Sequence, residues 1–161
     1  MLNNNSIGIE LDNIGHGFNY KIFSNTQMSV LEKLLKLLFN KYYIKKQNVL
    51  GHSDIAPDRK LDPGELFKWD RLAKKNLAYY PLVKKNTFNK IFFKLGDKST
   101  EIKKIKLKLI KIGYKCSQDN NFDIYLKLVV EAFQRRFLPE KINGIIDEKV
   151  YFRILDVSKN T

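Results

Sequence analysis

The sequence has almost no cysteine and no apolar segment long enough to span a membrane. Its 161 residues contain one cysteine, Cys116, which excludes an intramolecular disulfide and a zinc cluster built on cysteines. Three charged side chains interrupt the richest apolar stretch, residues 30–39, which falls short of the roughly 18–20 apolar residues that span a bilayer. Residues 1–6 have neither the basic segment nor the apolar core of a secretory signal. We therefore expect no membrane span.

Acidic residues are also scarce, since 17 Asp and Glu stand against 30 Lys and Arg, a formal net charge of +13. The excess lies mainly in residues 81–161, which hold 18 basic and 9 acidic side chains. A compositional drift toward Lys, Asn and Ile would produce this charge, and so would a polyanionic partner such as nucleic acid, an acidic membrane or a cell-wall polymer. Nucleic acid is not the expected partner, because no recognition motif accompanies the charge. A hydrophobic content of 43% excludes a disordered polycation.

Strand-like and helix-like patterns are mixed in residues 1–80, which predicts an α/β fold. Apolar and polar side chains alternate strictly over residues 6–12, as in a half-buried strand. Residues 48–51 predict a second, short buried strand. Helical spacing between them predicts a helix that begins with a capping box at Ser29 and Glu32 and ends near residues 45–46.

After residue 52 the pattern predicts only helices and loops. A further helix is expected over residues 65–77, followed by a linker at 81–94. Residues 95–158 then carry three apolar stripes at helical spacing, the first ended by Gly113 and the third capped by Asp147. We expect a small all-α three-helix bundle there, with a thin core.

His52 is the histidine best placed for chemistry. It follows the second predicted strand and enters a loop that contains Asp54, Lys60 and Asp62. A histidine beside acids is usually only hydrogen-bonded at the surface, although a loop directly after a strand is also where sites are built. Histidine nitrogen and carboxylate oxygen both suit Zn²⁺, but a catalytic site typically takes three protein ligands and a water. Spacing alone therefore leaves a zinc site and a plain surface histidine both open.

Glu10 and Lys60 are the other candidates for catalysis. Glu10 lies on the polar face of the first predicted strand, where a carboxylate is normally just solvated. Beside Gly8, however, a ligand could approach the strand closely, and a glutamate there could take a proton from a metal-bound water. Lys60 could neutralise the oxyanion that forms when water attacks a carbonyl.

Two stretches together resemble the zinc-dependent N-acetylmuramoyl-L-alanine amidases, relatives of phage T7 lysozyme and the peptidoglycan recognition proteins. These are Ser-Ile-Gly-Ile-Glu at 6–10 and the nearly gap-free Gly-His-Ser-Asp-Ile-Ala-Pro-x-Arg-Lys-x-Asp-Pro-Gly at 51–64, with Leu-Phe-x-Trp after it. The resemblance implies an amidase-type fold at 1–80, a Zn²⁺ cofactor, and His52 and Asp62 as metal ligands. It also implies Glu10 as general base and Lys60 as oxyanion stabiliser. The implied reaction is hydrolysis of the amide between N-acetylmuramic acid and L-alanine.

The second half resembles the three-helix peptidoglycan-binding module of cell-wall hydrolases. The resemblance is carried by Ile-Gly-Tyr at 112–114, by residues 130–137 and by Asn-Gly-x-Ile-Asp at 143–147. Phe133 and Phe137, at i and i+4, are expected to be core residues. Gln134, Arg135 and Arg136 lie beside them and are candidates for contacts with glycan or peptide carboxylates. Both resemblances imply peptidoglycan or muropeptides as the partner.

The chain departs from the amidase pattern in one respect. The first zinc ligand of that family is a histidine on an upstream strand, whereas nine residues precede Glu10 here. His16 lies in a loop that the resemblance places at the substrate cleft, so it is not assigned to the metal. We expect an amidase domain that is N-terminally truncated, and a catalytically inactive peptidoglycan-binding remnant is the alternative. The attached module favours the bacterial envelope or periplasm over the cytoplasm. The oligomeric state is not predicted.

Overall fold

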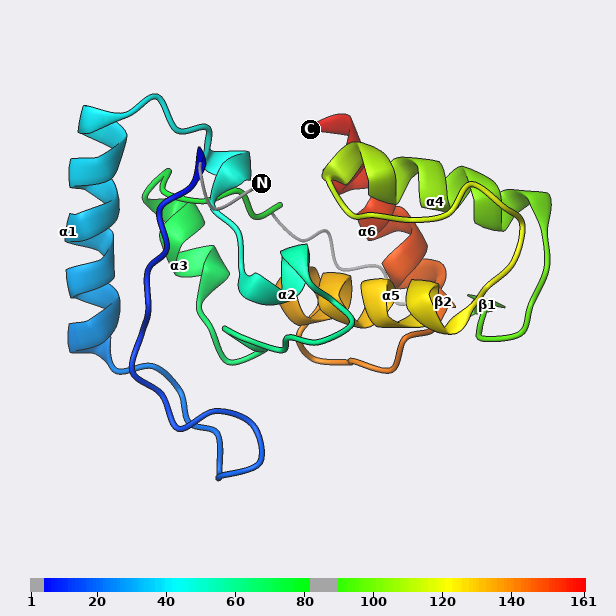
Figure 1. Cartoon of the computed structure of the whole chain (residues 1–161), viewed down its shortest axis with the longest axis horizontal. Helices are drawn as coiled ribbons and strands as arrows, with labels where there is room; N and C mark the ends of the chain where they lie inside the picture. Colours follow the sequence, from blue (N-terminus) through cyan, green and yellow to red (C-terminus); the bar gives the residue numbers. More distant parts are fainter. Residues whose placement is uncertain (1–4, 82–89) are drawn as a thin grey trace.

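The two halves of the chain lie side by side (Figure 1), and the buried residues of each half form an apolar core of its own. The computed structural model describes residues 5–81 and 90–161. In chain order the elements are α1 (Asn25–Lys41), the 3₁₀ helix η2 (Lys46–Asn48), α2 (His52–Ile55), α3 (Trp69–Lys74), β1 (Ile91–Phe93), α4 (Thr100–Ile112), α5 (Ile124–Phe137), β2 (Ile146–Asp147) and α6 (Glu148–Lys159). No helix in the described ranges has the length and apolarity needed to cross a membrane.

The sheet does not lie where the alternation in the sequence predicts it. Residues 6–12 and 49–51 do not form strands, and 6–12 make no backbone hydrogen bond to other backbone groups in the described part of the chain. Instead β1 pairs antiparallel with β2, with Ile91 opposite Asp147. Alternation fixes which side chains share a face, but a ladder also needs a neighbouring strand. The protein is therefore mixed helix and sheet, as expected, but the predicted strands at 6–12 and 48–51 are wrong.

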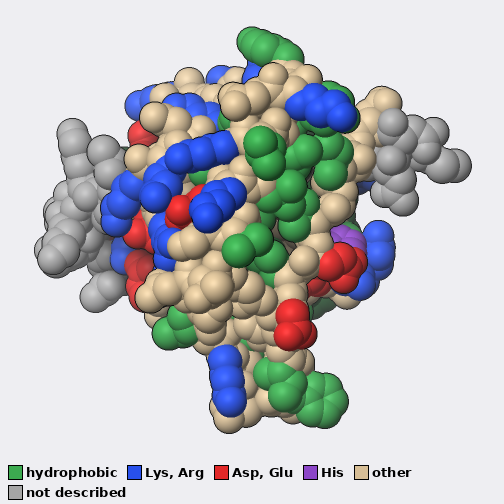
Figure 2. All heavy atoms as spheres, turned by 90° about the vertical axis from the view of Figure 1, so that its left-hand side faces the viewer, with side chains coloured by type: hydrophobic (Ala, Val, Ile, Leu, Met, Phe, Trp, Pro, Cys, Tyr) green, Lys and Arg blue, Asp and Glu red, His purple; other side chains and the backbone are tan. Residues whose placement is uncertain are grey.

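Helix α1 begins earlier than its sequence pattern predicts. Ser24 is the N-cap, and its hydroxyl accepts a hydrogen bond from the Gln27 amide at 3.1 Å. The predicted capping box at Ser29 is wrong, because Ser29 lies inside the helix and accepts a hydrogen bond from Arg71. The helix buries Met28 and two leucines against aromatic residues of the first core. Its outer face exposes apolar side chains, seen in Figure 2, among them Val30, Leu34 and Leu37.

Glu32 is a buried carboxylate that ties α1 to α3. Its side chain is 7% exposed and accepts a hydrogen bond from Arg71 Nε at 2.5 Å. Lys75 Nζ lies 3.1 Å from the other carboxylate oxygen. The hydrogen bond from Arg71 holds the pKa of this carboxyl below its ordinary value despite the opposing effect of burial.

Acid should therefore weaken the protein through Glu32. Because its pKa is lower in the folded chain than in the unfolded chain, its stabilising effect is present above the ordinary glutamate pKa and is lost as pH falls through the folded value. At pH 7 we expect Glu32→Gln to lower the free energy of unfolding by about 1–3 kcal/mol. The difference from the unmodified chain should shrink below pH 4 in urea titrations. A difference that does not change with pH would contradict this role.

Helices α4, α5 and α6 enclose the second core and, with the segments that connect them, are called the helical unit below. Local capping sets their ends: the side chains of Asp123 and Asp147 accept from the amides of Leu126 and Val150. Gly113 has a φ of 122° and ends α4, as predicted. The core contains sixteen buried residues from these helices, β2 and the loops between them, among them both expected core aromatics, Phe133 and Phe137.

The predicted domain limits of 1–80 and 95–158 stay predictions. Most of the predicted linker, residues 82–89, lies outside the described residues. Its last part is not a plain connection, because β1 at 91–93 pairs with β2.

Candidate functional site

A tight loop brings His52 and Asp62 together. Residue 52 opens α2, and the amide of Ser53 donates to the carbonyl of Asp62 at 2.9 Å, which closes the loop of residues 53–62. This backbone bond places His52 Nδ1 3.2 Å from Asp62 Oδ2. The two side chains are 44% and 61% exposed, so a solute reaches them. His52 and Asp62, ten positions apart in the sequence, therefore lie next to each other at the surface.

The pair fits two ligand positions of a zinc ion. Two ligand atoms that each lie about 2.0–2.1 Å from a tetrahedral Zn²⁺ are about 3.3 Å apart, close to the observed separation. Nitrogen and carboxylate oxygen are both zinc donors. Within residues 5–81 and 90–161, however, no group of three or more His, Cys, Asp or Glu side chains gathers. The described residues bring together two candidate ligands, where a catalytic zinc site takes three from the protein.

Glu10 and Lys60 are not joined to this pair by a hydrogen bond or an ion pair in the described part of the chain. Glu10 is exposed on the extended segment 6–12. Lys60 is half-buried, and its amide donates to the carbonyl of Ala56 at 3.0 Å. Among the described residues neither side chain has an ion pair or hydrogen bond to His52 or Asp62. Their catalytic roles therefore stay predictions.

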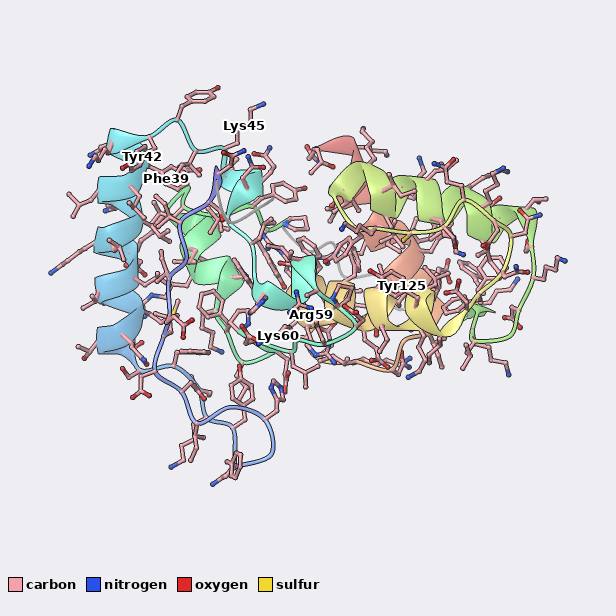
Figure 3. The ribbon with its side chains drawn as sticks, viewed as in Figure 1. Phe39, Tyr42, Lys45, Arg59, Lys60 and Tyr125 are labelled. Carbon is pink, nitrogen blue, oxygen red and sulfur yellow. The ribbon has the colours of Figure 1, made fainter. Side chains whose placement is uncertain are left out.

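The loop that carries Lys60 lies beside the helical unit. Figure 3 shows Arg59 and Lys60 next to α5, whose first turn carries Tyr125. Burial raises the pKa of the Tyr125 hydroxyl, and the negative charge of Asp58 on the same loop raises it further. The candidate site thus borders both halves of the molecule.

His16 has a partner of its own. Its Nε2 lies 2.9 Å from Glu65 Oε2, and its ring stacks on Tyr20 with 4.4 Å between centroids. Burial is the largest influence on the pKa of Glu65 and would raise it, but the hydrogen bonds from His16 and the backbone, with the charges of His16 and Arg135, together keep this pKa below the ordinary value. Tyr20 in turn donates to the carbonyl of Pro63, and burial raises the Tyr20 pKa to about 12. The loop with His16 thus braces the residues directly after Asp62.

Asp54 is the most connected residue of α2, and sequence reasoning gave it no structural role. Its Oδ2 accepts a hydrogen bond from the Gly51 amide at 2.8 Å and one from Arg136 Nη1 at 2.6 Å. Its Oδ1 accepts one from the Tyr114 hydroxyl at 2.7 Å. Burial, followed by the charge of Asp54, raises the pKa of Tyr114 well above its ordinary value, so the hydroxyl keeps the proton that it donates. A buried polar cluster thus joins α2 to the helical unit.

Arg136 and Gln134 are buried, which makes them wrong as surface contacts for glycan or peptide. Arg136 is 4% exposed, and its guanidinium lies over the ring of Trp69 with its Cζ 4.1 Å from the centroid. Gln134 is fully buried, and its side chain hydrogen-bonds Asn143 and Gly144. In the sequence, Arg136 stands between the basic Arg135 and the aromatic Phe137. Such a pattern does not distinguish a buried guanidinium from an exposed one.

A cavity of about 140 Å³ lies between the two halves next to this cluster. Apolar side chains dominate its lining, including Leu50, Ile55, Ile112 and Phe137. Arg136 also borders it, and its Nε has no hydrogen-bond partner among the described residues. The halves therefore meet through the polar cluster and leave space beside it.

Part of this chain is similar to known amidases. Residues 1–65 match the N-acetylmuramoyl-L-alanine amidase family. N-acetylmuramoyl-L-alanine amidase AmiD of Escherichia coli (strain K12) is 34% identical over 154 residues, which cover 91% of this chain and 54% of AmiD. The 1,6-anhydro-N-acetylmuramyl-L-alanine amidase AmpD of Haemophilus influenzae is 40% identical over 70 residues, 43% of this chain and 36% of AmpD.

The fold agrees with these matches. The structure of E. coli AmiD, in complex with the substrate anhydro-N-acetylmuramic acid-L-Ala-D-gamma-Glu-L-Lys, superposes with a TM-score of 0.73 at 26% identity. This similarity covers 88% of this chain and 54% of AmiD, so it extends into the helical unit. The chain spans about half the length of this relative.

Proposed function

We propose that this chain, a homologue of the N-acetylmuramoyl-L-alanine amidases, takes part in hydrolysis of the amide between N-acetylmuramic acid and L-alanine in peptidoglycan or its fragments. The observation that carries the proposal is the approach of His52 Nδ1 to Asp62 Oδ2, 3.2 Å apart and open to solvent, in the segment that matches the family. This pair would hold Zn²⁺. When bound, zinc would lower the pKa of a water molecule and polarise the scissile carbonyl.

Glu10 would transfer protons, and Lys60 would stabilise charge, during the reaction. Glu10 would accept the proton of the attacking water through its exposed carboxylate and return it to the leaving amine of L-alanine. Lys60 would stabilise the negative charge that develops on the carbonyl oxygen. A loop that carries Lys60 and also borders α5 would let the substrate contact both halves.

The helical unit would act as a peptidoglycan-binding module. In this proposal the catalytic part occupies residues 1–80 and the wall-binding part residues 95–158. The basic excess of the second half would attract the free carboxylates of the polymer, an effect that weakens as salt rises. We place the site of action in the bacterial envelope rather than the cytoplasm, on the ground of this attached module.

The test is release of the stem peptide by the purified 161-residue chain. The substrate is anhydro-N-acetylmuramic acid-L-Ala-D-gamma-Glu-L-Lys, the compound bound in the AmiD structure, with added Zn²⁺ in one arm and chelator in the other. We expect zinc-dependent release that falls about 100-fold or more in Glu10→Ala, with an unchanged melting curve. Asp12→Asn is the matched control, because it removes an exposed carboxylate two residues along the same segment. Unchanged turnover in Glu10→Ala would remove Glu10 from the mechanism.

Peptidoglycan binding without hydrolysis is the second candidate function. It is favoured by the donor count, since residues 5–81 and 90–161 gather no third donor beside the candidate ligands His52 and Asp62, and a catalytic zinc site takes three from the protein. Retention on purified sacculi with no peptide release in either arm would select this function. Equal retention on DNA would instead mean that charge alone governs binding.

A further inference from the structure

The turn that carries His52 is too short to be stable by itself. Helix α2 has four residues, and its turn contains backbone hydrogen bonds from the Ala56 amide to the carbonyl of His52 at 3.0 Å and from the Asp54 amide to the carbonyl of Gly51 at 3.2 Å. Nucleating a single helical turn costs free energy, so an isolated turn of this length does not persist in water. Its conformation, and with it the direction of His52, depends on contacts from outside the helix.

Two of these outside contacts come from the helical unit. Asp54, in the middle of α2, accepts hydrogen bonds from Tyr114 at 2.7 Å and from Arg136 at 2.6 Å. All three side chains are almost fully buried, with 7% exposure for Asp54 and 4% for Arg136. A charged hydrogen bond in such surroundings is stronger than an exposed one and has a narrow range of geometry.

Arg136 also fixes the residues on either side of α2. Its Nη2 donates to the carbonyl of Val49 at 2.9 Å, just before the turn, and lies 3.4 Å from the carbonyl of Tyr79. Its guanidinium stacks on Trp69, the first residue of α3. One side chain of α5 thus contacts the chain before, within and after the turn that carries His52.

We propose that Tyr114 and Arg136 are positioning residues, which act through Asp54 to hold the turn of His52 in the orientation that meets Asp62. The helical unit would then be part of the structure of the metal site as well as a module for the cell wall. The consequence for zinc rests on the proposed function, whereas the control of the α2 turn does not. Neither residue is expected to touch zinc or substrate.

Amide hydrogen exchange measured by NMR tests the proposal without any ligand. The variants are Tyr114→Phe, which removes one hydroxyl and keeps the ring, and Arg136→Lys, which keeps the charge and loses the fork of donors. In both, we expect the amides of Ser53 and Ala56 to exchange about tenfold or more faster, because a buried hydrogen bond to a charged group is lost. Amides in the middle of α4 and α6 serve as the reference for global stability.

Arg153→Lys is the matched control. Arg153 is also buried, at 7% exposure, but it donates to the carbonyl of Phe137 inside the helical unit and makes no hydrogen bond to α2. We expect it to leave the exchange of Ser53 and Ala56 unchanged relative to α4 and α6. The proposal is overturned if these two amides are unprotected in the unmodified chain, or if they respond equally in all three variants.

A titration with Zn²⁺ alone separates this proposal from the proposed function. If the unmodified chain binds zinc, Tyr114→Phe should weaken binding about tenfold, and Arg153→Lys should not. If the unmodified chain binds no zinc, the zinc role of His52 fails and the exchange data still decide whether the turn is held by the helical unit. Faster exchange with unchanged zinc affinity would show that the turn is held but that zinc does not depend on it, which overturns the consequence for the metal site.

Discussion

Replacing Gly51 by alanine is expected to separate the two candidate zinc ligands. A Cβ at this position would lie 2.6 Å from Pro63 Cδ and 3.4 Å from Trp69 Cζ2. Both are parts of rigid rings, so neither can turn away as the end of a flexible side chain would. Residues 62–64 would have to move outward, which carries Asp62 away from His52. Overpacking of this kind costs about 1–3 kcal/mol, and urea unfolding measures the loss.

Gly8→Ala is the control for that substitution. Gly8 also belongs to a segment that resembles the amidases, but an added Cβ there meets nothing within 4 Å and the backbone φ is ordinary. We expect no loss of stability and no change at the His52–Asp62 pair, monitored by the imidazole resonances of His52. Equal losses in both variants would show that close packing at Gly51 is not the cause.

Replacing Phe133 by alanine is expected to have the largest effect on stability. The ring is completely buried at the centre of the helical unit, with its centroid 4.8 Å from that of Phe137 and 6.3 Å from that of Tyr114. Deleting a buried phenylalanine ring costs about 3–5 kcal/mol, because apolar contacts are lost and a cavity remains. Domains of this size are stable by only about 5–15 kcal/mol, so the helical unit should lose most of its margin.

Circular dichroism in urea provides the measurement for Phe133→Ala. Phe152→Ala removes the same ring from α6 at a position that is 49% exposed, and we expect a change within about 0.5 kcal/mol. Because Tyr114 packs on Phe133, the α2 turn should also loosen in Phe133→Ala. Similar unfolding midpoints in the two variants would mean that the second core does not depend on this ring.

Much of the helical unit could be predicted because its signals are local. A cap needs one side chain and an amide three residues away, so Asp147 was recognisable without knowledge of the fold. Gly113 was recognisable in the same way, since a left-handed residue at a helix end favours glycine. The burial of Phe133 and Phe137 followed from helical spacing.

The errors concern features that need a distant partner. Ser29 and Glu32 have the spacing of a capping box, but Ser24 is the N-cap of α1. Glu32 instead forms ion pairs with Arg71 and Lys75. Residues 6–12 have the alternation of a strand and no ladder in the described chain. The residue pattern of a segment gives its propensity for a helix or a strand, whereas contacts with distant segments determine which structure it forms.

The helices of the second half, their caps and their apolar faces could be predicted from the order of the residues, as could the resemblance that singled out His52 and Asp62. That these two side chains meet at 3.2 Å, and that Tyr114 and Arg136 hydrogen-bond Asp54 in the α2 turn, became visible in the folded chain alone. The physical reason is the range of the forces. Spacing and capping act over three or four residues, whereas a buried hydrogen bond between residues 82 positions apart exists only after the chain has folded.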